Sequence, residues 1–88
     1  MSEPSEHNQQ PKPKEYKFFV DAKPYETEHQ YRSGTQIKQE ASAPLDYQLF
    51  LEEEGDTPDK PISDSETVDL AGRIKHFYAV PPATFGLR

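Results

Sequence analysis

Three segments of the chain, residues 15–21, 25–29 and 46–52, alternate with the period of a β-strand, and residues 74–80 form a mostly hydrophobic run that predicts a buried closing strand. Alternation of this kind predicts strands that bury one face. The composition of residues 21–24 is typical of a turn, so the first two segments predict a hairpin. Ile62 marks a further short strand, and the pattern as a whole predicts five strands.

One short helix is predicted between the hairpin and the third strand. Ser33-Gly34-Thr35 can cap its start, because a serine side chain there accepts a hydrogen bond from the first turn. Ile37 and Ala41 lie four residues apart on one helical face, and Pro44 prevents continuation beyond about Ser42. A helix of about two turns is marginal in isolation, so it must be held by packing against the sheet.

The predicted order of elements is strand, strand, helix, strand, short strand, strand. This order is typical of an α+β fold in which one sheet packs on one helix. The helix and the later strands leave enough chain for the first and last strands to lie side by side and parallel. Residues 64–72 are expected to form an acidic loop or a single helical turn, pinned by Val68 and Leu70.

Composition divides the chain into a short segment, one domain and a tail. Residues 1–14 contain no Leu, Ile, Val or Phe and are rich in polar residues and proline, so we expect them to be disordered. Residues 15–80 are expected to form the domain and residues 81–88 an extended tail. Only 32% of all residues are hydrophobic, which predicts a thin core.

The same composition excludes several classes of protein. The chain has no cysteine, and we find no apolar run long enough for a membrane span or a signal peptide. We therefore expect a cytoplasmic protein without a membrane partner, a monomer when free. The net charge of −6 disfavours nucleic acid and is consistent either with solubility alone or with a basic partner.

No pattern in the sequence predicts catalysis or a metal. His7, His29 and His76 share no ligand spacing, and the acidic runs are typical of solvated turns and loops. A glycine-rich phosphate loop and a serine nucleophile elbow are both missing from the sequence. We therefore expect a protein that is not an enzyme and holds no metal and no cofactor.

The residues after the last strand predict a stiff arm. Two consecutive prolines fix φ and remove two backbone donors, so the chain neither continues the strand nor begins a helix. The arm residues that we expect to engage partner enzymes are Pro81, Pro82, Ala83, Thr84 and Phe85. The arm ends in Gly86, and Leu87-Arg88 follow. Glycine permits a close backbone approach, which suggests a protein handled through this end. The alternative is an ordinary frayed terminus.

Several segments in order resemble one family. They are Tyr16 to Lys23, Ser33 to Ile37, Val68 to Leu70 and Phe77 to Pro81. In sequence and spacing they are similar to the multiubiquitin-type family, the ubiquitin-like domains of bacterial ubiquitination-like operons. The resemblance covers about residues 15–86.

The resemblance implies a β-grasp fold and the function of a protein modifier. A peptidase would cut between Gly86 and Leu87, and Gly86 would then be joined to target proteins. A partner activating enzyme, which uses ATP, and a conjugating enzyme would carry out the joining. Related operons are associated with defence against phage.

Two features depart from the resemblance and leave alternatives open. Many relatives carry tandem copies, whereas this chain has one, and Gly86 follows Phe85 where ubiquitin and sulfur carriers have two glycines. One alternative is an interaction module that binds partners without covalent attachment. A less favoured alternative is a sulfur carrier.

Strand alternation also predicts a partner-binding patch on the sheet face turned away from the helix. If the neighbours of Phe19 in its strand point inward, Phe19 points outward. The same logic turns Phe50, His76 and Tyr78 outward, and in a β-grasp sheet their strands would be neighbours. A contiguous exposed aromatic patch in so polar a chain predicts an interface, unless N-terminal residues or side-chain stems cover it.

Overall fold

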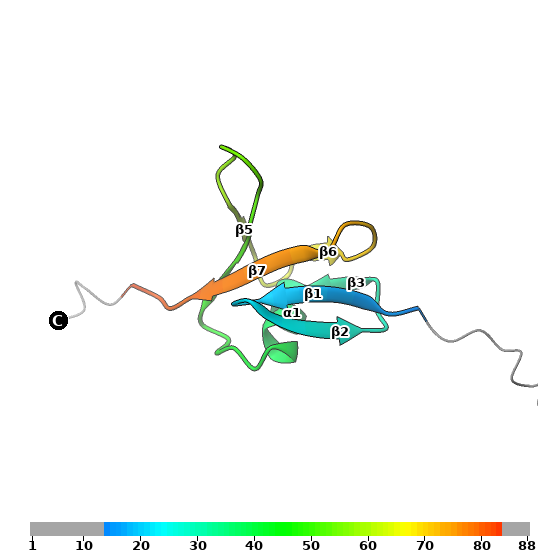
Figure 1. Ribbon diagram of the computed structural model, residues 1–88. Helices are drawn as coiled ribbons and strands as arrows, with labels where there is room; N and C mark the ends of the chain where they lie inside the picture. Colours follow the sequence, from blue (N-terminus) through cyan, green and yellow to red (C-terminus); the bar gives the residue numbers. More distant parts are fainter. Residues whose placement is uncertain (1–13, 84–88) are drawn as a thin grey trace, which may run out of the picture.

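The computed structural model describes residues 14–83, which form two sheets and one helix. The main sheet has the strand order β2-β1-β7-β4-β5 (Figure 1). Its strands are β1 Tyr16–Val20, β2 Lys23–Thr27, β4 Gln48–Leu51, β5 Lys60–Ile62 and β7 Lys75–Val80. The second sheet pairs β3 Tyr31–Ser33 with β6 Thr67–Asp69, and the helix α1 spans Gly34–Glu40. The predicted α+β class is confirmed.

The predicted hairpin forms from β1 and β2, which are antiparallel and joined by only two residues. Asp21 and Ala22 both have positive φ, 53° and 68°. Two consecutive residues of this kind make the turn whose twist matches that of the flanking strands. The turn is shorter than residues 21–24, because Lys23 and Pro24 already pair with β1.

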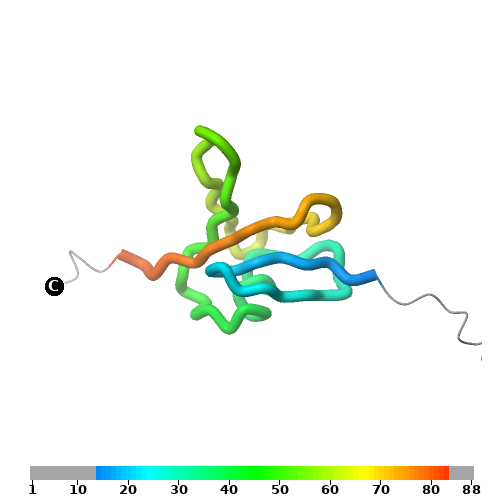
Figure 2. Tube along the Cα trace, in the orientation of Figure 1, coloured from blue at the N-terminus to red at the C-terminus, as the bar shows by residue number. Residues whose placement is uncertain are grey.

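β1 and β7 lie side by side and parallel at the centre of the sheet, as predicted (Figure 2). α1 lies behind the sheet in the view of Figure 1. Eight hydrophobic side chains between them are buried and form one cluster. They are Phe18, Val20, Ile37, Leu49, Ile62, Val68, Leu70 and Phe77. The other face of the main sheet is called the outer face below.

The predicted cap at the start of α1 is also confirmed. Ser33 accepts a hydrogen bond from the backbone N–H of Gln36, and the Gln36 side chain accepts one from the N–H of Ser33. Gly34 is buried, and a Cβ there would clash with the backbone oxygen of Ser63. Glycine is thus required where the helix start meets the segment before β6. The helix ends at Glu40, slightly earlier than predicted.

The prediction of a loop or helical turn at residues 64–72 is wrong in its middle part. Thr67–Asp69 form β6, which pairs antiparallel with β3 and places Val68 opposite Arg32. Val68 and Leu70 are buried, as expected for the residues that pin this segment. Strands of three residues offer too few positions for an alternation to be recognised, and for the same reason the sequence does not predict β3.

Residues 1–13 and 84–88 lie outside the described part of the chain. The expected disorder of residues 1–14 therefore remains a prediction, since only Lys14 of that segment is described. Among the helices that the structure describes, none is long and apolar enough to cross a membrane.

Candidate functional site

The outer face brings together the four aromatic residues that strand alternation turns outward. Phe19 of β1 lies opposite His76 of β7, and Phe50 of β4 lies opposite Tyr78 of β7. Each pair is stacked with nearly parallel rings. The ring centroids are 4.7 Å apart for Phe19 and His76 and 5.3 Å apart for Phe50 and Tyr78. The sequence prediction of their placement agrees with this geometry, while their use by a partner stays a prediction.

Two prolines extend these stacks to both edges of the sheet. Pro24 of β2 lies opposite Phe19, and Pro61 of β5 lies opposite Phe50. Residues directly opposite each other in neighbouring strands share a face, so both prolines lie on the outer face. We call the six residues the aromatic platform, namely Phe19, Pro24, Phe50, Pro61, His76 and Tyr78. The sequence analysis missed both prolines, although the alternation from Phe19 across a two-residue turn leads to Pro24.

The backbone nitrogen of each proline also points toward an open edge of the main sheet. The N–H of Asp21 donates to the oxygen of Phe77, so the odd-numbered residues of β1 bond toward β7. Pro24, opposite Phe19, therefore directs its backbone away from β1. The same reasoning applies to Pro61, because Glu52 bonds to His76 and the even-numbered residues of β4 thus bond toward β7. Each outer edge lacks one N–H donor at its proline.

A carboxylate fixes one end of the platform. The hydroxyl of Tyr78 donates to Asp59 at 2.7 Å, and the backbone N–H of Glu53 donates to the other carboxylate oxygen at 3.0 Å. These two donors hold the pKa of Asp59 below its usual value, with the Glu53 N–H as the larger cause. The hydrogen bond to Asp59 raises the pKa of Tyr78. The Tyr78 ring is therefore positioned both by Phe50 and by the segment between β4 and β5.

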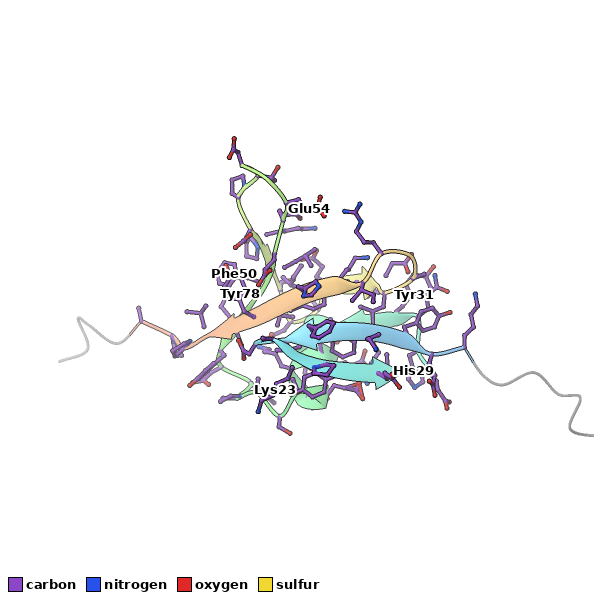
Figure 3. The ribbon with its side chains drawn as sticks, viewed as in Figure 1. Lys23, His29, Tyr31, Phe50, Glu54 and Tyr78 are labelled. Atoms are coloured by element: carbon purple, nitrogen blue, oxygen red, sulfur yellow. The ribbon has the colours of Figure 1, made fainter. Side chains whose placement is uncertain are left out.

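That segment projects from the sheet as a long loop beside the platform (Figures 1 and 3). Figure 3 shows Phe50 and Tyr78 next to each other below the loop that carries Glu54. The N–H of Glu52 donates to the oxygen of His76 at 2.8 Å, which places Glu52 opposite His76 on the outer face. Glu54 forms an ion pair with Arg73 at 2.5 Å, which ties the loop to the chain just before β7.

A hollow of about 230 Å³ lies between this loop and the start of β7. It is lined by Leu51, Glu52, Glu53, Glu54, Arg73, Ile74, Lys75 and His76. Ile74 is 46% exposed and supplies apolar surface, while three consecutive glutamates make one wall acidic. The sequence analysis treated this acidic run as a solvated turn. The position of these glutamates in the sequence does not indicate that they lie beside the aromatic residues in the fold.

A second hollow, of about 390 Å³, lies near the end of the β1–β2 hairpin that is opposite its turn. It is lined by Glu15, Glu26, Thr27, Glu28, His29, Arg32 and Glu40. Arg32 and Glu40 approach to 3.7 Å there. Within residues 14–83, no group of three or more potential ligands is placed to hold a metal ion.

The beginning of the predicted arm directly follows the central strand. β7 ends at Val80, and Pro81, Pro82 and Ala83 are exposed and belong to no regular element. The two prolines thus end the strand, as the sequence predicts. The remaining residues of the predicted site, Thr84, Phe85, Gly86 and Leu87, lie outside the described part of the chain. Their roles in conjugation and cleavage stay predictions.

Comparison with protein families adds one finding to this geometry. The model of the Multiubiquitin family matches residues 16–81, which run from the first residue of β1 to the first residue after β7. Comparison with curated proteins gives no match, and comparison with solved structures gives none. The matched range includes all six platform residues and ends before Gly86.

Proposed function

The chain belongs to the Multiubiquitin family and is a ubiquitin-like protein with a β-grasp fold, and we propose that it is a protein modifier joined through Gly86. In this proposal the chain performs no catalysis and binds no cofactor. A partner activating enzyme uses ATP to activate the carboxylate of Gly86, and a conjugating enzyme transfers it to target proteins. The bacterial origin and the role in defence against phage are part of the same proposal and rest on the resemblance.

One observation supports the proposal most strongly. β7 carries His76 and Tyr78 of the platform and continues without an intervening element into the exposed Pro81, Pro82 and Ala83. An enzyme that binds the platform would therefore lie close to the arm that leads to Gly86. The prolines lose little entropy when they enter a groove, because their conformation is already restricted.

Trimming before activation is the second step of the proposal. Leu87 and Arg88 follow Gly86, and the bulky charged side chain of Arg88 would obstruct the narrow channel of an activating enzyme. Removal of Leu87 and Arg88 by a peptidase leaves Gly86, which has no Cβ to obstruct close approach. We expect a chain that ends at Gly86 to be activated without the peptidase, and the full chain to require it.

A reconstituted reaction with the cognate activating enzyme tests this function. Enzyme-bound adduct should form from the chain ending at Gly86 and from the full chain only after peptidase treatment. Gly86→Ala should fold normally yet form about tenfold less adduct or lower still, since the added methyl group enters the reacting site. Equal adduct from the untreated full chain would contradict the trimming step.

The same reaction separates the alternatives. An interaction module would bind its partners through the platform and form no adduct, an outcome that the stacked aromatic face keeps open. A sulfur carrier would acquire a thiocarboxylate at Gly86, visible as a mass increase of the free protein. Phe85 before Gly86 makes this outcome the least expected.

A further inference from the structure

We propose that the outer face binds a partner through an arginine-bearing basic segment, whose guanidinium groups contact the aromatic platform and the carboxylates beside it. The inference deepens the partner-binding part of the proposed function and does not depend on covalent attachment at Gly86. Three features of the described residues carry it: the edges of the sheet, the exposed rings and the charge around them.

The two edge strands of the main sheet are poorly suited to pairing with a strand of a partner. A peptide that adds a strand to a sheet needs alternating donors and acceptors along the open edge. β2 presents Pro24 and β5 presents Pro61 at those edges, and both lack an N–H. Strand addition is therefore disfavoured at each side of the main sheet, and the broad outer face remains for recognition.

The rings on that face suit a planar cation. Phe19, Phe50 and Tyr78 are half-buried and His76 is exposed, so each stack keeps part of its surface open. Arginine stacks on aromatic rings with its guanidinium plane and also binds carboxylates with two parallel hydrogen bonds, whereas lysine offers a compact charge. A surface that places rings and carboxylates together favours arginine over lysine.

The charges beside the rings supply the carboxylates. Glu52 lies opposite His76, Asp59 bonds to Tyr78, and Glu53 lies between them in the projecting loop. Among the described residues, Glu54 is paired with Arg73, but no ion pair involves Glu52, Glu53 or Asp59. The acidic side of the platform is therefore complementary to a basic partner.

The hollow next to the platform provides a place for one long basic side chain. Ile74 and Leu51 contribute apolar surface for its methylene groups, and Glu52 and Glu53 supply carboxylates in a lining that also includes Arg73 and Lys75. Basic side chains bind in this manner by covering apolar surface with the stem while the head group meets a carboxylate. The neighbouring stack of Phe19 and His76 then accommodates a second arginine.

A titration of the isotope-labelled full chain with two blocked hexapeptides tests the proposal. One peptide alternates glycine with arginine and the other alternates glycine with lysine, both at physiological salt. Chemical-shift changes are expected at Phe19, Phe50, His76 and Tyr78 and in the loop from 52 to 59. The arginine peptide should bind about threefold to tenfold more tightly, as a stacked guanidinium predicts.

Matched variants locate the contact. Phe50→Leu and Glu52→Gln should each weaken the arginine peptide by about threefold or more, one through the ring and the other through the charge. Tyr31→Leu and Glu28→Gln are the controls, because Tyr31 is 58% exposed on β3 and Glu28 lines the other hollow. The controls should bind as the unchanged chain does. Glu52→Gln keeps the test decisive if Phe50→Leu folds poorly.

Several results would overturn the proposal. Equal affinity for the two peptides would show that net charge alone drives binding. Chemical-shift changes centred on Glu26, Glu28 and Glu40 would show that the peptide binds at the other hollow. Shifts at the platform that change on dilution of the free protein would show a second copy as the occupant. Contacts in the free chain between residues 1–13 and the rings would show that its own segment covers the face. Absence of saturable binding would equally reject it.

Discussion

The buried side chain of Lys38 connects three parts of the fold. It lies in α1 and is only 2% exposed. Its ammonium donates to the backbone oxygens of Leu45 and Tyr47 at 2.7 and 2.8 Å and to the carboxylate of Asp64 at 2.7 Å. All three donors are used, which is the condition under which a buried charge is tolerated. Lys38 thus joins α1 to the segments before β4 and before β6.

Replacing Lys38 by methionine should therefore destabilise the fold. Methionine fills similar space but donates nothing, so two carbonyls and one carboxylate lose their partner. We expect the free energy of unfolding to fall by about 2–4 kcal/mol in urea denaturation. Lys23→Met is the control, because Lys23 is exposed, and it should change stability by less than about 0.5 kcal/mol. Equal effects of the two variants would show that the contacts of Lys38 contribute little.

Asp59 and Tyr78 give the platform a defined pH range. The depressed pKa of Asp59 means that its bond to Tyr78 is fully present above 3.8 and is lost as the pH falls through the lower, folded-state value. The raised pKa of Tyr78 means that the phenol keeps its proton up to 10.0 and donates until the pH rises through its higher, folded-state value. The contact therefore persists throughout the interval between these limits.

Asp59→Asn should lower the pKa of Tyr78 toward its usual 10.0, because the largest cause of the rise is removed. The ring carbon shifts of Tyr78, followed by NMR as the pH rises, measure this change. Asp56→Asn is the matched control, since Asp56 is an exposed residue of the same loop. A Tyr78 titration identical in the two variants would mean that the phenol is held by something other than Asp59.

Among the elements, the long and strongly patterned ones are predictable from the sequence. β1 alternates over five residues, β7 is a mostly hydrophobic run of six, and α1 begins after the capping residue Ser33 and ends before Pro44. β3 and β6 are not predictable, because three residues carry no period and each strand exists only through its partner. The requirement for glycine at position 34 is likewise not predictable from the local sequence. A Cβ there would clash with Ser63, which lies far along the chain.

The edge strands carry a testable role for proline. Pro24→Val would restore an N–H on the open side of β2, and Pro61→Val would do so on β5. Exposed edges with complete donors pair with other chains, so both variants should self-associate more at high concentration. Sedimentation velocity measures this directly, with Pro44→Val in a loop as the control. Sedimentation of the edge variants indistinguishable from that of the control would show that the prolines do not protect the edges.

In the whole molecule, the candidate site is assembled from residues that are far apart in the sequence. Alternation alone turns Phe19, Phe50, His76 and Tyr78 outward. Their stacking in pairs depends on the register of β7 between β1 and β4, which the resemblance suggests but the residues do not specify. The hollow beside the platform could not be predicted from the sequence. Its two walls come from segments about 20 residues apart that meet only in the folded chain.

In the proposed function, the fold links a recognition face to the arm that carries the attachment residue. The core holds β7 at the centre of the sheet, the platform lies on its outer face, and the chain leaves through Pro81 and Pro82. Recognition and attachment would thereby lie on one strand and its continuation. In our proposal, partners read the platform while the carboxylate of Gly86 reacts beyond it.

Mass spectrometry of modified target proteins tests this proposal most directly. An endopeptidase specific for lysine cuts after Lys75 and leaves any Arg88 junction intact, so a target joined through trimmed Gly86 should retain a remnant that runs from His76 to Gly86. We predict this remnant on peptides from cells that carry the chain and its cognate enzymes, and its loss with Gly86→Ala. A remnant that extends to Arg88 would contradict trimming, and no remnant on any target would contradict the modifier itself.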